Sequence, residues 1–196
     1  TKLIKYSVNA AEEVISPTKD YIVYLENNNI NIAYENGTII KVTNDELGIL
    51  NGSSNTHRNE FGIDRGFWIS PDGSKILFYK KNEQMVANYP LVDFSTRIAQ
   101  EKPIKYPMAG MKSEEVSLHI YDLATKQSIS LKISGDKEQF LTMPSWDPTS
   151  TTVFVGVLNR GQDHLKLQCY NALTGEFQTQ LFEEKATTYV EPNKPL

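Results

Sequence analysis

The residues with the clearest chemical potential lie in a short polar segment, T-H-R-N-E-F-G-I at 56–63, whose only carboxylate belongs to Glu60. An ionised carboxylate accepts hydrogen bonds, and ion pairing with the flanking His57 or Arg58 would orient it. Exposed pairs of this kind contribute only about 0–1 kcal/mol. A lone Glu in a loop is most often a solvated side chain or a residue at a helix start. Residue type alone therefore predicts no specific chemistry here.

Other reactive residue types are sparse and scattered. Cys169 is alone, which excludes an internal disulfide and a cysteine metal site. His57, His119 and His164 show no metal-ligand spacing, so we expect them at surface or half-buried strand positions, and we predict no metal and no cofactor. The chain contains no G-x-S-x-G motif, the turn that presents the nucleophile in α/β-hydrolases. We therefore expect no α/β-hydrolase nucleophile, and no catalytic residue of that kind, in this chain.

Composition and charge limit which classes of partner the chain is expected to bind. The 196 residues carry a net charge of -4 and show no basic stripe, which argues against a nucleic-acid partner. The longest apolar runs have the length of strands, so no membrane-spanning helix is predicted. The chain opens within a pattern already under way and stops without a cap, and we expect it to be a piece of a longer protein.

The elements that must position Glu60 are strands. Apolar runs at 21–25, 30–34 and 38–43 are separated by Asn-rich turns, among them Asn36-Gly37. Asn-Gly suits a tight hairpin because its central residues need positive φ, which Gly adopts freely and Asn tolerates. An antiparallel meander is therefore predicted.

The same order of strand, proline turn and strands recurs three times, with anchor prolines at 17, 71 and 148. Short strands repeating at such a period are typical of β-propeller blades. We predict an all-β fold, a β-propeller fragment of about three four-stranded antiparallel blades that forms a single partial domain over residues 1–196. The expected blades cover residues 11–45, 64–134 and 138–185.

The first two anchor prolines are 54 residues apart, whereas the second and third are 77 apart. The difference is explained by an irregular insertion at 83–114 in the middle blade. Long irregular loops in compact domains are usually functional or disordered. Its apolar and aromatic content favours an ordered extension packed on a neighbour, with Tyr89 and Tyr106 in a core or interface, and dimer contacts are one use for it. Trp68 and Trp146 are expected to pack between blades.

Several motifs together resemble the N-terminal propeller domain of the dipeptidyl peptidase IV family and its bacterial relatives. These motifs are H-R-N-E-F-G-I at 57–63, F-W-I-S-P-D-G at 67–73, Y-P-L-V-D at 89–93, K-Y-P-M-A-G at 105–110 and L-N-R-G-Q-D-H-L at 158–165. Ser-Pro-Asp-Gly is common to many propellers. The acidic segment followed at a distance by Tyr-Pro-x-Ala-Gly is much more specific.

The resemblance implies an eight-bladed propeller above a C-terminal α/β-hydrolase domain that supplies the Ser-Asp-His triad. Such enzymes remove dipeptides, or in some relatives tripeptides, from the free N-terminus of peptides, with Pro or Ala next to the cut bond. It also implies a bacterial periplasmic or envelope location for the parent protein and allows a homodimer.

The resemblance further implies a substrate-binding site. In the family a Glu-Glu pair binds the α-ammonium group of the substrate; here its second member falls on Glu60 and its first on Asn59, with a weaker expectation for Arg58. This departure puts the accepted length of the N-terminal segment in doubt. The family's Arg that contacts the substrate carbonyl would lie upstream of Thr1, and a further substrate-facing segment would begin near Leu196.

Blade repeats alone specify no chemistry. The alternative is therefore a TolB-like or WD-type propeller that binds proteins and has no associated enzyme. A strand-G-x-S-x-G-helix sequence downstream would favour the peptidase, and further blades followed by a stop would favour the scaffold.

Overall fold

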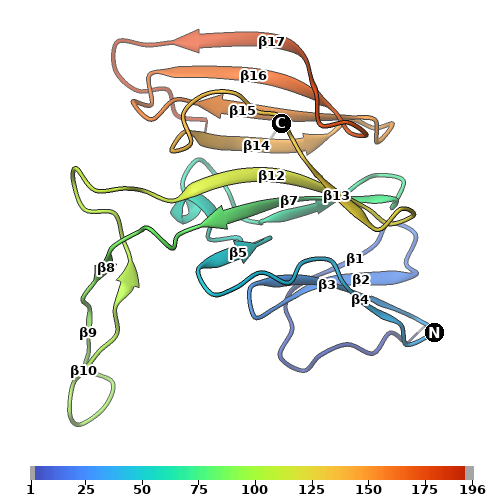
Figure 1. Cartoon of the computed structure of the whole chain (residues 1–196), viewed down its shortest axis with the longest axis horizontal. Helices are drawn as coiled ribbons and strands as arrows, with labels where there is room; N and C mark the ends of the chain where they lie inside the picture. Colours follow the sequence, from blue (N-terminus) through green and yellow to red (C-terminus); the bar gives the residue numbers. More distant parts are fainter. Residues whose placement is uncertain (1–2, 193–196) are drawn as a thin grey trace.

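The computed structural model describes residues 3–192, so residues 1–2 and 193–196 of the expected domain lie outside the described residues. Three antiparallel sheets stand one beside the next, as Figure 1 shows. Each is a β-propeller blade, and the predicted all-β fragment of three blades is confirmed.

The first blade comprises β1 (Ala11–Ile15), β2 (Tyr21–Glu26), β3 (Asn29–Tyr34) and β4 (Ile39–Lys41). The middle blade comprises β5 (Ile49–Asn51), β6 (Phe67–Ile69), β7 (Lys75–Asn82), β12 (Glu115–Asp122) and β13 (Gln127–Ser130). The third blade comprises β14 (Phe140–Trp146), β15 (Thr152–Leu158), β16 (His164–Asn171) and β17 (Phe177–Lys185).

The packing of β7 explains why the blades stack. Its residues Ile76, Leu77, Phe78 and Tyr79 are all buried, although successive side chains of a strand point to opposite faces. Ile76 and Phe78 join an apolar cluster with the first blade, whereas Leu77 and Tyr79 join a cluster with the third. The middle blade is thus covered on both faces, and burial of these two clusters drives its association with both neighbours.

Two hydrogen bonds also connect the middle and third blades, and their geometry restricts how the two blades can pack. The Tyr79 hydroxyl donates to the Leu141 carbonyl at 2.6 Å, and Trp146 Nε1 donates to the Trp68 carbonyl at 3.1 Å. Both tryptophans are partly buried against the shared cluster. The predicted packing of the two tryptophans between blades is confirmed.

The inner edge of the middle blade is split. β6 pairs with residues 76–78 of β7, and β5 pairs with residues 80–82 of the same strand. The two strands therefore share one edge, and residues 52–66 leave the sheet between them. The sheet also starts earlier than residue 64, the expected start of this blade, because β5 lies before it. A three-residue strand carries too little alternation to be recognised in the sequence.

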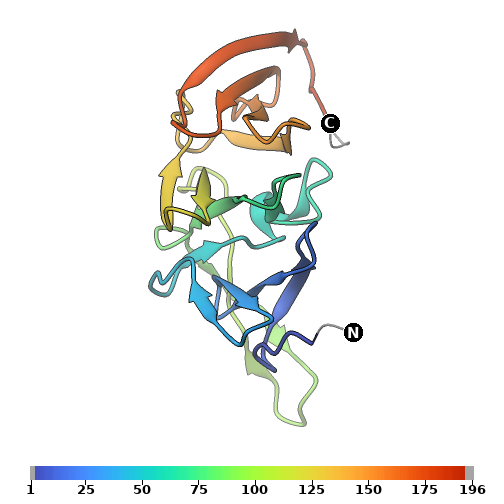
Figure 2. The ribbon, with the colours of Figure 1, turned by 90° about the vertical axis from the view of Figure 1, so that its right-hand side faces the viewer.

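The insertion in the middle blade forms an arm of two short ladders that projects beyond the blades in both Figure 1 and Figure 2. Its strands are β8 (Asn88–Tyr89), β9 (Val92–Asp93), β10 (Gln100–Glu101) and β11 (Ile104–Lys105). The insertion is ordered, as predicted. Packing is limited to the base, where Val86 is buried, and Phe94 and Ile98 near the tip are about 80% exposed. Tyr89 and Tyr106 meet edge to face and are 41% and 44% exposed, so they are not core residues, and a place in an interface stays a prediction.

Candidate functional site

The loop at 52–66, here called the inner-edge loop, is closed at its base by one residue of β7. Gly52 N donates to the Tyr79 carbonyl at 2.8 Å, and Tyr79 N donates to the Gly66 carbonyl at 2.9 Å. The two ends of the loop approach so closely that a Cβ on Gly66 would lie 2.1 Å from the Gly52 carbonyl oxygen. Only glycine fits at position 66, and the narrow base sends the loop out from the blade edge.

The tip of this loop is a left-handed turn. The φ angles of His57, Arg58 and Asn59 are 49°, 54° and 61°, within the one-turn helix η1 (Thr56–Asn59). Residues with a Cβ rarely adopt this conformation, and each such residue costs about 1–3 kcal/mol unless its surroundings impose it. Glu60 then returns to an extended conformation with φ −71° and ψ 166°. The turn therefore needs anchoring contacts.

His57 provides the main anchor. Its backbone N–H donates to Glu114 Oε1 at 2.9 Å, and its Nδ1 lies 3.5 Å from that same oxygen. Its Nε2 accepts the Leu141 N–H of the third blade at 3.1 Å, which leaves the ring proton on Nδ1. The ring also packs edge-on to Phe140 and Tyr79. His57 is 3% exposed and lies in a loop, so the expectation of a surface or half-buried strand position is wrong for this residue.

The protonation states of this anchor follow from its burial. Burial lowers the pKa of His57, because an imidazolium would lose its hydration, and the neighbouring carboxylate opposes this only in part. Burial acts to raise the pKa of Glu114, but the hydrogen bond from His57 and the charge of Lys81 prevail and hold that pKa below its ordinary value. A neutral His57 therefore stands beside an ionised Glu114.

Glu60 itself is exposed, and within residues 3–192 no hydrogen bond or ion pair engages its carboxylate. The Arg58 guanidinium lies over the Tyr106 ring of the arm, 5.6 Å from its centroid. Asn59 Nδ2 donates to the Ser54 carbonyl at 2.9 Å. The hypothesis that His57 or Arg58 orients Glu60 by ion pairing is therefore wrong, and the carboxylate is left open to a ligand.

Glu60 borders an open cavity of about 520 Å³ between the inner-edge loop and the third blade. Phe61 and Phe140 pack at 4.9 Å between ring centroids, and the Arg160 guanidinium lies 5.1 Å from the Phe140 centroid. The remaining lining residues are Arg58, Gly161, Gln162 and Tyr189. The open Glu60 carboxylate can accept hydrogen bonds from an organic ammonium, whereas the Phe140 ring face is already covered by Arg160 and Arg58 adds a second positive charge to the cavity. The sequence motif L-N-R-G-Q contained Arg160, but nothing local indicated that it faces Glu60's cavity.

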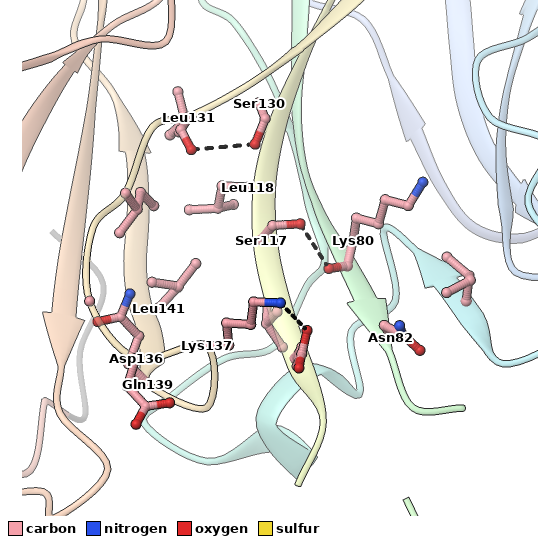
Figure 3. Close-up of a pocket in the computed structure, with 15 residues that line it drawn as sticks. Lys80, Asn82, Ser117, Leu118, Ser130, Leu131, Asp136, Lys137, Gln139 and Leu141 are labelled. Carbon is pink, nitrogen blue, oxygen red and sulfur yellow. Dashed lines mark hydrogen bonds and ion pairs between the residues drawn. The ribbon is translucent and has the colours of Figure 1, made fainter. Parts of the chain in front are cut away.

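A second cavity, of about 340 Å³, lies between the middle and third blades (Figure 3). Its polar groups engage one another: Lys137 pairs with Glu115 at 3.7 Å, and the Ser117 hydroxyl donates to the Lys80 carbonyl at 3.4 Å. None of the predicted site residues lines it. It is an interblade gap rather than the candidate site.

Residues 3–192 contain no group of three or more His, Cys, Asp or Glu side chains that could hold a metal ion. In the same range no helix has the length and apolar character needed to cross a membrane.

The fold and the loop together define a propeller segment whose inner-edge loop carries an exposed carboxylate with no hydrogen bond or ion pair to any residue in 3–192. The chain belongs to the family described as the dipeptidyl peptidase IV (DPP IV) N-terminal region, whose model matches residues 2–196.

Solved structures and curated relatives agree with this assignment. A crystal structure from Bacteroides ovatus, of a protein that carries the provisional name dipeptidyl aminopeptidase IV, is 38% identical with a TM-score of 0.87, covering 96% of this chain and 26% of that one. Porphyromonas gingivalis dipeptidyl peptidase 4 has the same fold at 22% identity and a TM-score of 0.85, over 96% of this chain and 28% of that one.

Two fungal proteins provisionally named dipeptidyl-aminopeptidase B are similar as well. The protein from Sordaria macrospora is 30% identical over 84% of this chain and 20% of its own length. The protein from Talaromyces stipitatus is 29% identical over 76% of this chain and 18% of its own length. The chain thus spans about a fifth of the length of the curated relatives it matches.

Proposed function

We propose that this chain is the non-catalytic propeller part of a serine exopeptidase, and that Glu60 binds the α-ammonium group of the peptide substrate. The enzyme would remove dipeptides, or tripeptides, that end in Pro or Ala at the cut bond. The catalytic triad would come from a C-terminal α/β-hydrolase domain of the same protein. The names of the relatives support the reaction class, and a periplasmic or envelope location stays a prediction from the resemblance.

One observation carries the proposal: an exposed carboxylate without a partner stands on a loop whose backbone is held by buried contacts. A carboxylate at a fixed place selects substrates with a free ammonium at a fixed reach from the nucleophile, so binding energy becomes positioning. The carboxylate would thereby gate which peptides reach the nucleophile.

Asn59 and Arg58 have different places in this proposal. The Asn59 amide nitrogen is engaged by Ser54, which leaves its side-chain oxygen as a second acceptor for the ammonium. Asn59 would then replace the missing first Glu of the family pair with a neutral acceptor. Arg58 lines the same cavity, and a direct contact between it and the substrate stays a prediction.

The proposed function is tested by blocking the amine. We expect the full-length protein to cleave a free-amine Xaa-Pro reporter peptide and to lose this activity on the N-acetylated peptide, because acetylation removes the charge that Glu60 binds. Steady-state kinetics with both peptides measure the difference. Equal rates would contradict ammonium recognition, and no cleavage of either peptide would favour the scaffold propeller.

We also propose that the arm contributes to a homodimer. Phe94 and Ile98 are 80% and 82% exposed, and Val92, on the neighbouring strand, is 57% exposed. Apolar side chains gathered on a projecting element are typical of an interaction surface. An arm with backbone pairing along its length can present them without first having to fold on its partner.

We expect the double substitution Phe94→Ser and Ile98→Ser to convert the dimer to a monomer, because it removes the largest apolar area from the arm. Light scattering coupled to size-exclusion chromatography of the full-length protein measures the mass. Leu173→Ser is the matched control, since Leu173 is 73% exposed but lies in the third blade. A dimer that survives the arm substitutions would rule out this interface.

A further inference from the structure

A buried cluster of two charged side chains and a neutral histidine lies beneath the inner-edge loop. Lys81, Glu114 and His57 are 2%, 9% and 3% exposed. Lys81 Nζ lies 3.8 Å from Glu114 Oε2 and 3.3 Å from Glu83 Oε2, which is closer to solvent. Charges removed from water are costly unless they are paired and hydrogen-bonded, and apolar side chains of similar size often stabilise a fold better. Stability alone therefore gives little reason for this cluster.

The contacts of the cluster fall just before the strained turn and at its first left-handed residue. Lys81 Nζ donates to the Asn55 carbonyl at 3.2 Å, just before the turn. Glu114 accepts the His57 N–H at 2.9 Å, within it. Both are bonds to the backbone, so they act on the path of the chain rather than on one side chain. They can hold His57, Arg58 and Asn59 in the left-handed conformation that these residues otherwise avoid.

The cluster also stands where the arm joins the blade. Lys81 is the last residue but one of β7, before the chain enters the arm, and Glu114 directly precedes β12, where the chain returns. His57 connects the cluster to the third blade, because its Nε2 accepts a hydrogen bond from Leu141 N. The arm, the middle blade and the third blade therefore meet at this point, and the cluster connects the inner-edge loop to all three.

We propose that Glu114, together with Lys81 and His57, forms a positioning cluster that sets the place of the Glu60 carboxylate and thereby the reach at which a substrate ammonium is bound. This inference rests on the proposed function of Glu60. None of the three groups needs to touch the substrate. Lys81 and Glu114 hold the backbone five and three residues before Glu60, and His57 ties the same stretch to the third blade. A displacement of about 1 Å at a substrate-positioning group can cost up to about 100-fold in rate.

The test is a double-mutant cycle in the full-length protein, with kcat/KM for a free-amine Xaa-Pro reporter as the readout. We expect Glu114→Gln to lower kcat/KM about tenfold in the wild-type background, mainly through KM. In the Glu60→Gln background the same change should cost less than about twofold, because residues that act through one another are not additive. A cluster that only stabilised the fold would lower both backgrounds by the same factor.

The chain offers a matched control and a milder variant. Glu115→Gln makes the same chemical change one residue away, at a 37% exposed side chain that pairs with Lys137, and should leave kcat/KM unchanged. Should Glu114→Gln fail to fold, Glu83→Gln weakens the cluster at its solvent edge, and its smaller effect must likewise vanish in the Glu60→Gln background.

The outcomes separate this inference from the proposed function. If Glu60→Gln lowers kcat/KM but Glu114→Gln and Glu83→Gln act equally in both backgrounds, the positioning cluster is overturned and the ammonium site stands. If Glu60→Gln has no effect, both are overturned. Loss of the Glu114 effect in the Glu60→Gln background supports both.

Discussion

Replacement of Glu60 by Gln is expected to lower kcat/KM for a free-amine Xaa-Pro reporter more than about tenfold while the protein stays folded. Loss of one partner from a desolvated charge pair typically costs about 2–5 kcal/mol, and each 1.4 kcal/mol corresponds to about a factor of ten. The fold should survive because the Glu60 side chain is exposed and has no hydrogen bond or ion pair within the described residues. Stability and activity thus respond independently at this position.

Two further variants sharpen the result. Glu60→Asp keeps the charge but shortens the side chain. A kcat/KM for Glu60→Asp that lies between the values for wild type and Glu60→Gln would show that reach matters as well as charge. Asp64→Asn removes a carboxylate from the same loop, where Asp64 is 76% exposed and pairs only with Arg65 at 3.2 Å. It should have no effect. Unchanged kinetics for Glu60→Gln, or an equal loss for Asp64→Asn, would place the ammonium anchor elsewhere.

The second large effect is expected at the base of the inner-edge loop. Gly66→Ala places a Cβ 2.1 Å from the Gly52 carbonyl oxygen, which is backbone and cannot rotate away. The two ends of the loop must separate, which strains the bonds that both make with Tyr79. We expect the free energy of unfolding to fall by about 1–3 kcal/mol or more, the usual cost of overpacking. Because the loop is displaced, kcat/KM should fall as well.

Denaturant unfolding of the full-length protein measures the stability loss. Gly161→Ala is the matched control, because a Cβ there meets its nearest neighbour at 3.5 Å, an ordinary contact. Gly161 borders the same cavity as Glu60, so this control also tests whether any added methyl near the site is harmful. A Gly66→Ala protein as stable as the Gly161→Ala protein would show that the loop base is not tightly closed.

The arrangement of the blades was accessible from the sequence because it depends on local patterns. Alternating apolar residues and proline turns recur in each blade, and these determine where a strand runs and where it turns. The apolar run of β7 was likewise readable as a strand, but its burial on both faces is a finding of the structure. The three-residue strand β5, at Ile49–Asn51, and the two-residue strands β8 to β11 of the arm escaped, since so few residues cannot show a period.

The candidate site was accessible only in part. Glu60 was located through the motif that surrounds it, while its local pattern indicated a solvated side chain. Left-handed conformations are expected mainly at Gly, Asn, Asp and His, so the conformation of Arg58 ran against local preference, and nothing local predicted three such residues in a row. No sequence signal connected Lys81, His57 and Glu114, which meet only when the arm and the third blade close around the loop.

By itself the sequence thus determined the fold class and the repeat order, and the motif around Glu60 located the carboxylate for which we propose ammonium binding. Only the tertiary structure decided that this carboxylate is unpaired, that its loop is left-handed and that buried charges hold it. The physical reason is that strand and turn patterns are set by neighbouring residues, whereas ion pairing and backbone strain depend on which distant residues are brought together.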